Sequence, residues 1–179
     1  RMRKFLSYYR PYRHLLLADL ACTLVIVATT LILPLCARYI TQNLPGENTP
    51  DALMNIVMMG GFMLALVAIH TACNLFVDYR GHMMGAMMES DMRAELFDHL
   101  QKQSFSFYDE QKTGQLMSRI TNDLFWLSEF YHHGPEDLTI AALKFGGAFI
   151  ILLTINVPLT LMIFLFLPPM ALYAFYFNR

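Results

Sequence analysis

The sequence predicts an all-α membrane protein, built of four transmembrane helices with a long helical region in the cytoplasm. Hydrophobic residues make up 56% of the 179 positions, whereas soluble domains usually contain about 45–50%. They gather in runs of the length that crosses a bilayer, which is ~20 residues. A polar region in the middle of the chain keeps the periodicity of a helix. The net charge of −1 gives no electrostatic basis for a nucleic-acid partner.

The amino-terminal segment, residues 1–14, is basic and aromatic. Its cations and tyrosines are Arg1, Arg3, Lys4, Tyr8, Tyr9, Arg10, Tyr12 and Arg13. Aromatic rings gather at lipid headgroups, and Lys and Arg favour the cytoplasmic side of a membrane. We therefore predict an interfacial helix or elbow before the first span.

Two spans follow, at about 15–40 and 52–77. Pro34 is expected to bend the first span, and the second span carries no charge. Between them, residues 41–51 are rich in Pro, Gly and Asn, a composition typical of a loop.

The helix of the second span is expected to continue far into the cytoplasm, because no proline occurs between residues 78 and 103. Apolar residues form a ridge at a spacing of four: Met84, Met88, Met92, Leu96 and Leu100. Two i,i+4 pairs in the favourable order support the same helix: Glu89–Arg93 and Asp98–Lys102. One helix over 52–103 would be roughly 78 Å long, about twice the thickness of a bilayer with its headgroups. Gly81 and Gly85 are its weakest points.

Residues 104–113 break this helix. Helical periodicity resumes near Gly114 and leads to a third span at about 138–155. The Gly134-Pro135 pair should kink or interrupt that helix.

A very short turn, Asn156-Val157-Pro158, leads into the fourth span at about 159–177. Pro168 and Pro169 should kink this span, because proline supplies no backbone N–H. The span contains no charged residue.

The distribution of Lys and Arg predicts the topology. Residues 1–14 and 78–137 carry five cations each, whereas 41–51 and 156–158 carry none. Cytoplasmic loops are enriched in Lys and Arg. Both termini and the helical region 78–137 are therefore expected in the cytoplasm.

No catalytic motif is present. The chain lacks the phosphate-binding pattern Gly-x-x-x-x-Gly-Lys-Ser/Thr, the zinc-protease pattern His-Glu-x-x-His and the nucleophile elbow Gly-x-Ser-x-Gly. The three cysteines lie in apolar segments and do not form a disulfide framework. His132 and His133 are adjacent, so on a helix they point apart, and we predict a polar cluster there rather than a metal site.

Three polar residues inside spans are candidates for a substrate path: Asp19, His70 and Lys144. Intramembrane charges usually pair or face water. Asp19 and Lys144 could pair, could line a cavity separately, or could lie near the interface with Lys144 snorkelling to the headgroups. His70 is expected to be a hydrogen-bonded packing residue rather than a proton relay. The thirteen methionines are expected to act as flexible core filler rather than as an adaptable ligand surface.

The hairpin at 104–123 combines residue types with separable roles. Phe105, Phe107 and Tyr108 are apolar anchors that could fill a groove on a soluble partner. Thr113 could cap the next helix, and Gly114 could allow a sharp change of direction. Arg119 and Asp123 have i,i+4 spacing in the less favourable order. These residues alone would also suit an ordinary polar hairpin.

The pattern Phe107-Tyr108-Asp109, Thr113-Gly114, Leu116, Ser118-Arg119, Asp123 resembles the first intracellular loop of ABC exporters of the bacterial multidrug and lipid type. The resemblance extends over nearly the whole chain. It implies that the hairpin touches an ATPase domain, through Phe107, Tyr108, Asp109, Thr113, Gly114, Arg119 and Asp123.

The same resemblance implies part of a six-helix transmembrane domain, in which spans five and six and the nucleotide-binding domain are absent. ATP and Mg²⁺ would bind in that missing domain, and no cofactor is expected in this chain. A second transmembrane half, identical or different, would complete a pore in the inner membrane that exports drugs, lipids or other amphipathic substrates by alternating access. The alternative is a stand-alone four-span scaffold that docks a cytosolic partner through 104–123.

Overall fold

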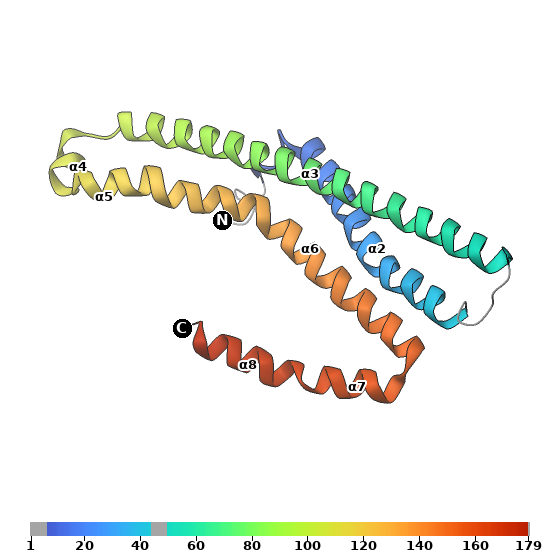
Figure 1. The fold of residues 1–179 in the computed structure, drawn as a ribbon. Helices are drawn as coiled ribbons and strands as arrows, with labels where there is room; N and C mark the ends of the chain where they lie inside the picture. Colours follow the sequence, from blue (N-terminus) through green and yellow to red (C-terminus); the bar gives the residue numbers. More distant parts are fainter. Residues whose placement is uncertain (1–6, 44–49, 179) are drawn as a thin grey trace. The chain divides into compact units, whose positions relative to one another are not determined.

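The protein is almost wholly helical over residues 7–43 and 50–178, the part that this computed structural model describes. Three of the predicted amino-terminal cations, Arg1, Arg3 and Lys4, lie outside the described residues, as do most of the loop at 41–51 and Arg179. The helices are α2 (Arg13–Asn43), α3 (Pro50–Gln101), α4 (Phe105–Glu110), α5 (Thr113–Ser118), α6 (Leu124–Ile155), α7 (Val157–Leu165) and α8 (Leu167–Phe177) (Figure 1). One π-helical turn, Arg119–Asp123, links α5 to α6.

Four helical stretches of the described chain are long and apolar enough to cross a membrane. They are Arg13–Gln42, Ala52–Gln101, Thr113–Ile155 and Val157–Phe177. Each predicted span lies inside one of them, which confirms the all-α, four-span prediction. Large apolar side chains such as Leu64 and Leu165 are exposed on these helices, as expected of surfaces that face lipid rather than water.

The chain divides into two compact units, residues 1–140 and 141–179. In the first unit, α2 packs along α3, and α3 then continues past α2 toward the hairpin (Figure 1). In the second unit, the end of α6 and α7 are joined by ring contacts of Phe164 with Phe145 and Phe149, at centroid distances of 5.1 and 4.4 Å.

The long helix α3 is continuous from Pro50 to Gln101, as the sequence predicts, and neither Gly81 nor Gly85 interrupts it. Both predicted ion pairs form along it. Arg93 pairs with Glu89, and Lys102 Nζ lies 2.6 Å from the Asp98 carboxylate. These surface pairs contribute only a few tenths of a kcal/mol each, so α3 is held mainly by the face that it buries.

That buried face is the predicted methionine ridge. Met84, Met88 and Met92 are at most 5% exposed and form one core with Tyr9, Leu124 and Tyr131. Their unbranched side chains fill the irregular space between α3, the start of α6 and the amino-terminal segment. Burial of these three residues supports the core-filler interpretation.

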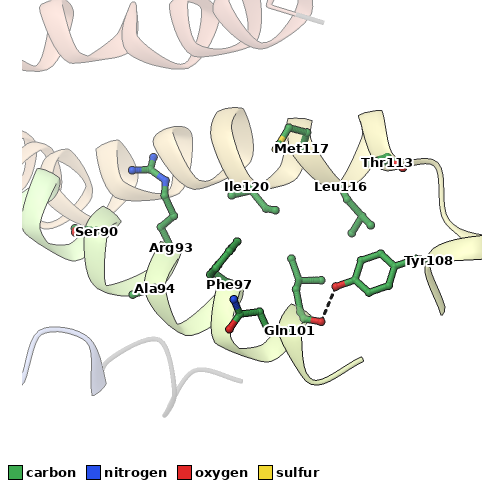
Figure 2. Close-up of a pocket in the computed structure, with 11 residues that line it drawn as sticks. Ser90, Arg93, Ala94, Phe97, Gln101, Tyr108, Thr113, Leu116, Met117 and Ile120 are labelled. Atoms are coloured by element: carbon green, nitrogen blue, oxygen red, sulfur yellow. Dashed lines mark hydrogen bonds between the residues drawn. The ribbon is translucent and has the colours of Figure 1, made fainter. Parts of the chain in front are cut away.

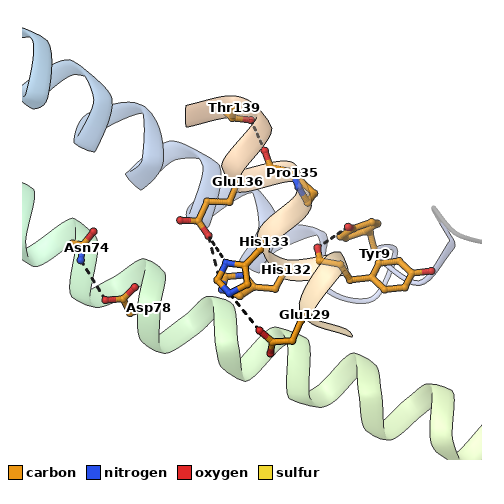
Figure 3. Close-up of polar contacts among 10 residues, drawn as sticks. Tyr9, Asn74, Asp78, Glu129, His132, His133, Pro135, Glu136 and Thr139 are labelled. Carbon is orange, nitrogen blue, oxygen red and sulfur yellow. Dashed lines mark hydrogen bonds and ion pairs between the residues drawn. The ribbon is translucent and has the colours of Figure 1, made fainter. Parts of the chain in front are cut away.

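The amino-terminal tyrosines each make a hydrogen bond to the protein through the hydroxyl group. The Tyr8 hydroxyl donates to Glu95, and the Tyr12 hydroxyl donates to Asp91 at 2.7 Å. The Tyr9 hydroxyl donates to the backbone carbonyl of Tyr131 at 2.7 Å (Figure 3). Burial raises the pKa of Tyr9 to about 12, so its hydroxyl remains a donor at neutral pH.

The prolines have different effects in different helices. Helix α2 continues through Pro34 and α6 continues through Pro135, so of the two outcomes predicted at Gly134-Pro135, a kink or an interruption, the interruption does not occur. The fourth span is divided at Phe166 into α7 and α8, as Pro168 and Pro169 predict. Two successive prolines withhold two N–H donors from the preceding turn, and the helix cannot bridge the gap.

Candidate functional site

The hairpin between α3 and α6 is made of α4, α5 and the π-helical turn (Figure 1). Its helices end where the backbone becomes extended, at Ser104 (φ −73°, ψ 159°) and again at Gln111 and Lys112 (ψ 138° and 110°). All three conformations are open to any residue. The chain therefore needs no glycine to turn here.

Two sequence predictions about this turn are wrong. Thr113 is the first residue of α5 rather than its cap, since Lys112 holds the N-cap position and no side chain caps the helix. Gly114 lies inside α5, so the change of direction falls at Gln111 and Lys112 instead.

Tyr108 ties the hairpin to the end of α3. Its hydroxyl donates a hydrogen bond of 2.5 Å to the carbonyl of Leu100 in the last turn of α3, and the same carbonyl also accepts from the Gln103 N–H at 3.0 Å. The ring also meets Phe107 edge-on, with centroids 5.4 Å apart. Tyr108 thus acts as a C-terminal cap and fixes α4 against α3.

Next to this contact lies an apolar groove of about 560 Å³ (Figure 2). One wall comes from α3, with Phe97 and Leu100, and the other from α5 and the π-helical turn, with Leu116 and Ile120. Tyr108 closes the end nearest the hairpin tip. Phe105, at the tip, is 92% exposed, and an aromatic ring in that position can serve as an anchor for a partner.

The remaining predicted hairpin residues are solvent-facing. Asp109, Thr113, Arg119 and Asp123 are all exposed. Arg119 and Asp123 begin and end the π-helical turn, and no ion pair joins them in the described part of the chain. Their charges are therefore available to a partner.

The three candidates for a substrate path lie in different surroundings. Asp19, on α2, is 2% exposed. His70, on α3, has its Nδ1 2.9 Å from the Thr29 hydroxyl of α2, the hydrogen-bonded packing that the sequence suggested. Lys144 is half-buried and belongs to the second unit, so its pairing with Asp19 stays a prediction.

The polar cluster predicted at His132 and His133 is present, but the sequence analysis missed its third imidazole. His82 of α3 meets both His132 and His133 of α6, at ring-centroid distances of 4.9 and 5.4 Å. Glu129 and Glu136 lie beside the same rings (Figure 3). Fifty residues separate His82 from His132, and no local pattern joins them, so only the packing of α3 against α6 reveals the cluster.

Comparison with known proteins places the chain in a family. Residues 16–179 match the model of the ABC transporter transmembrane region. An uncharacterized ABC transporter ATP-binding protein of Bacillus subtilis is 44% identical over 179 residues, which is 99% of this chain and 30% of that protein.

Two further relatives carry functional names. A Bacillus subtilis protein named "putative multidrug export ATP-binding/permease protein" is 26% identical over 170 residues, 93% of this chain and 29% of that protein. The ATP-dependent lipid A-core flippase of Idiomarina loihiensis is 29% identical over 123 residues, 68% of this chain and 20% of that protein.

The chain thus spans about 30% of the length of the first of these relatives. The matched family model covers the spans and the hairpin alike, and the resemblance that the hairpin motif suggested is confirmed. On this sequence and this fold, the chain belongs to the ABC transporter transmembrane region family.

Proposed function

We propose that this chain is the membrane-embedded drive element of an ATP-driven exporter. The observation that carries the proposal is the hairpin: Tyr108 clamps it to the end of α3, while Phe105 and the charged residues around it face outward. Family membership and the names of the multidrug and flippase relatives support an exporter of amphipathic molecules. They give no comparable support to the stand-alone adaptor.

In the proposed mechanism the hairpin touches a nucleotide-binding domain. The contact residues would be Phe107, Tyr108, Asp109, Thr113, Gly114, Arg119 and Asp123. ATP and Mg²⁺ would bind in that domain, and its closure would push the hairpin. Because α3 is a single helix from Pro50 to Gln101, a displacement at its cytoplasmic end is transmitted along its length to the membrane. Rigid helices can act as levers of this kind in domain motions.

A second transmembrane half, identical or different, would complete the pore in the inner membrane. Both termini of this chain and residues 78–137 would lie in the cytoplasm, as the cation distribution indicates. Asp19, His70 and Lys144 would line or support the substrate path. Polar and ionisable groups within a membrane are costly to bury, so the few that occur there usually have a function.

Replacing Tyr108 by Ala in the full-length transporter tests the coupling role. The variant removes both the clamp on Leu100 and an aromatic anchor, and loss of a buried aromatic at an interface commonly costs more than ~1 kcal/mol. We expect reduced transport and reduced substrate stimulation of ATP hydrolysis, with substrate binding retained. Transport assays in vesicles and ATPase assays on the same preparation measure both.

Two controls sharpen this experiment. Tyr108→Phe keeps the ring and removes only the hydroxyl that binds Leu100, so it separates the clamp from the anchor. Tyr79→Ala removes an equally large, exposed ring from α3 outside the hairpin. If Tyr108→Ala transports as well as the Tyr79→Ala control, the hairpin has no part in coupling.

A further inference from the structure

We propose that His82, His132 and His133 form a binding site for a divalent transition-metal ion such as Zn²⁺, with Glu136 as the fourth ligand. All four residues lie in the first unit, on α3 and α6. The site would join the two long helices, and it is independent of the exporter function proposed above.

The spacing of the ligand atoms suits a small ion. One nitrogen from each of the three imidazoles lies within 4.8 Å of the others. Around a tetrahedral Zn²⁺ with bonds of about 2.0–2.1 Å, ligand nitrogens are roughly 3.3 Å apart. The rings are therefore at most about 1.5 Å too far apart, and His82 is exposed, so its side chain is free to rotate inward.

Neighbours on a helix usually point apart, but the rings of His132 and His133 turn toward each other, with centroids 4.4 Å apart, so the prediction that they point apart is wrong. His82 supplies a third imidazole, since it reaches both rings from α3. Glu136, one turn further along α6, places the same carboxylate oxygen 3.9 Å from His132 Nε2 and 3.9 Å from His133 Nδ1. The Glu136 carboxylate is therefore placed to act as a ligand beside these two imidazoles.

Gly81 makes this approach possible. A Cβ atom at position 81 would lie 1.9 Å from Cε1 and 2.6 Å from Nε2 of His132. The His132 ring thus occupies the space that a side chain would need. It packs directly on the backbone that precedes His82, which brings the two imidazoles together.

Unsatisfied buried atoms point to a missing partner at this position. His132 is 2% exposed, and its Nδ1 has no hydrogen-bond partner among the described residues. Asp19 is also 2% exposed, its Oδ1 likewise has no hydrogen-bond partner in the described chain, and its carboxylate lies within 4.8 Å of His132 and Glu136. Buried polar atoms without partners are rare and costly. A bound cation would compensate the negative charge of the buried Asp19 carboxylate. A neutral group at this position would not.

Glu129 is placed to orient the His133 ring as a metal ligand. His133 Nε2 lies 3.4 Å from Glu129, so a carboxylate can hold that nitrogen while Nδ1 faces the other rings. Metal-binding histidines commonly donate their second N–H to a carboxylate. Neutral imidazoles without thiolates favour Zn²⁺, Ni²⁺ or Cu²⁺ over Mg²⁺ or Ca²⁺.

Zinc binding to the full-length protein tests the proposal. The protein is purified with an affinity tag that contains no histidine, stripped with a chelator, and titrated with Zn²⁺ against a competing chelator dye. We expect His82→Gln to weaken zinc binding at least about tenfold, since loss even of an outer-shell partner commonly costs 10–100-fold. Because His82 is exposed, this variant should keep the fold.

Two matched controls and a second readout complete the design. His99→Gln and His14→Gln remove exposed histidines outside the cluster and should bind zinc as the wild type does. Zn²⁺ should raise the midpoint of thermal unfolding of the wild type and of both controls, but not of His82→Gln. Equal zinc affinity in the wild type and His82→Gln, or equal thermal shifts, would overturn the proposal.

Discussion

A single hydroxyl compensates for a proline in α6. Pro135 cannot donate to the carbonyl four residues earlier, which is that of Tyr131. The Tyr9 hydroxyl donates to this carbonyl instead, at 2.7 Å. The helix therefore continues through Pro135, and the amino-terminal segment is fixed to α6 by the same bond.

Replacing Tyr9 by Phe should destabilise the protein, because it removes the hydrogen bond to the backbone carbonyl of Tyr131. Loss of such a bond typically costs about 0.5–1.5 kcal/mol, measurable as a lower midpoint of thermal unfolding in detergent. The exposed bond of Tyr12 with Asp91 provides the control, and Tyr12→Phe should have a smaller effect. Equal losses in the two variants would contradict the compensating role of Tyr9.

The pH dependence of this contribution has a defined sign. The pKa of Tyr9 rises from 10.0 to about 12 on folding, because the hydroxyl is buried. A group whose pKa is higher in the folded state contributes fully below its unfolded value. The stabilisation by Tyr9 should thus be complete below pH 10 and be lost between pH 10 and 12. The loss over this range should be smaller in Tyr9→Phe, where Tyr8 and Tyr12 still carry raised pKa values.

Gly81→Ala should also destabilise the protein, although alanine is intrinsically a better helix former than glycine. Alanine favours a helix over glycine by ~1 kcal/mol, but here its Cβ would overlap the buried His132 ring. Overpacking of this kind typically costs about 1–3 kcal/mol.

Gly60→Ala is the matched control for this change, because position 60 on the same helix has open space around it. Thermal unfolding of the two variants should move in opposite directions. A Gly81→Ala protein as stable as Gly60→Ala would show that His132 does not need the space.

At the scale of elements, the caps decide where helices begin and end. The Asn156 side chain accepts a hydrogen bond from Leu159 N–H at 3.1 Å, and Pro158 occupies the first turn of α7. Proline suits that position because its missing N–H would have no partner there. The very short turn between α6 and α7 is thus built from one capping residue and one proline.

Asn156→Ala should weaken this turn. Loss of an N-cap acceptor costs about 0.5–2 kcal/mol, and the midpoint of thermal unfolding should fall accordingly. Asn156→Asp retains an acceptor oxygen and should unfold close to the wild type. An alanine variant indistinguishable from the aspartate variant would mean that water replaces the cap at no cost.

At the scale of the whole molecule, charge distribution predicts which side of the membrane each segment occupies. Two of the five cations of residues 78–137, Arg80 and Arg93, lie on α3, and the other three, Lys102, Lys112 and Arg119, lie in or beside the hairpin. The exporter proposal requires the hairpin in the cytoplasm.

A single cysteine at Gln115 tests the topology. The three native cysteines are free and can be replaced by Ala or Ser, and position 115 is exposed on α5. A membrane-impermeant thiol reagent should label Gln115→Cys only after the cells are opened. Labelling of intact cells would place the hairpin outside and would exclude contact with a cytoplasmic ATPase domain.

The sequence by itself determined the four spans, the unbroken α3, the methionine ridge and the family. The spans follow from hydropathy, the unbroken helix and its ridge from the spacing of apolar residues, and the family from a local motif. Each of these signals lies within a few turns of helix. The break at Phe166 was predictable for the same reason, since Pro168 and Pro169 act on the turn that precedes them.

Only the tertiary structure decided what depends on distant partners. The sequence predicted a kink or an interruption at Pro135, but the helix is continuous there, and the Tyr131 carbonyl accepts from the hydroxyl of Tyr9, 122 residues away. His132 and His133 are adjacent in the sequence, but only the fold brings His82 of another helix against both rings. The sequence suggested a cap at Thr113 and a turn at Gly114, but the chain turns at Gln111 and Lys112. Any residue can adopt the extended backbone conformations found there, so the residue types could not predict this position.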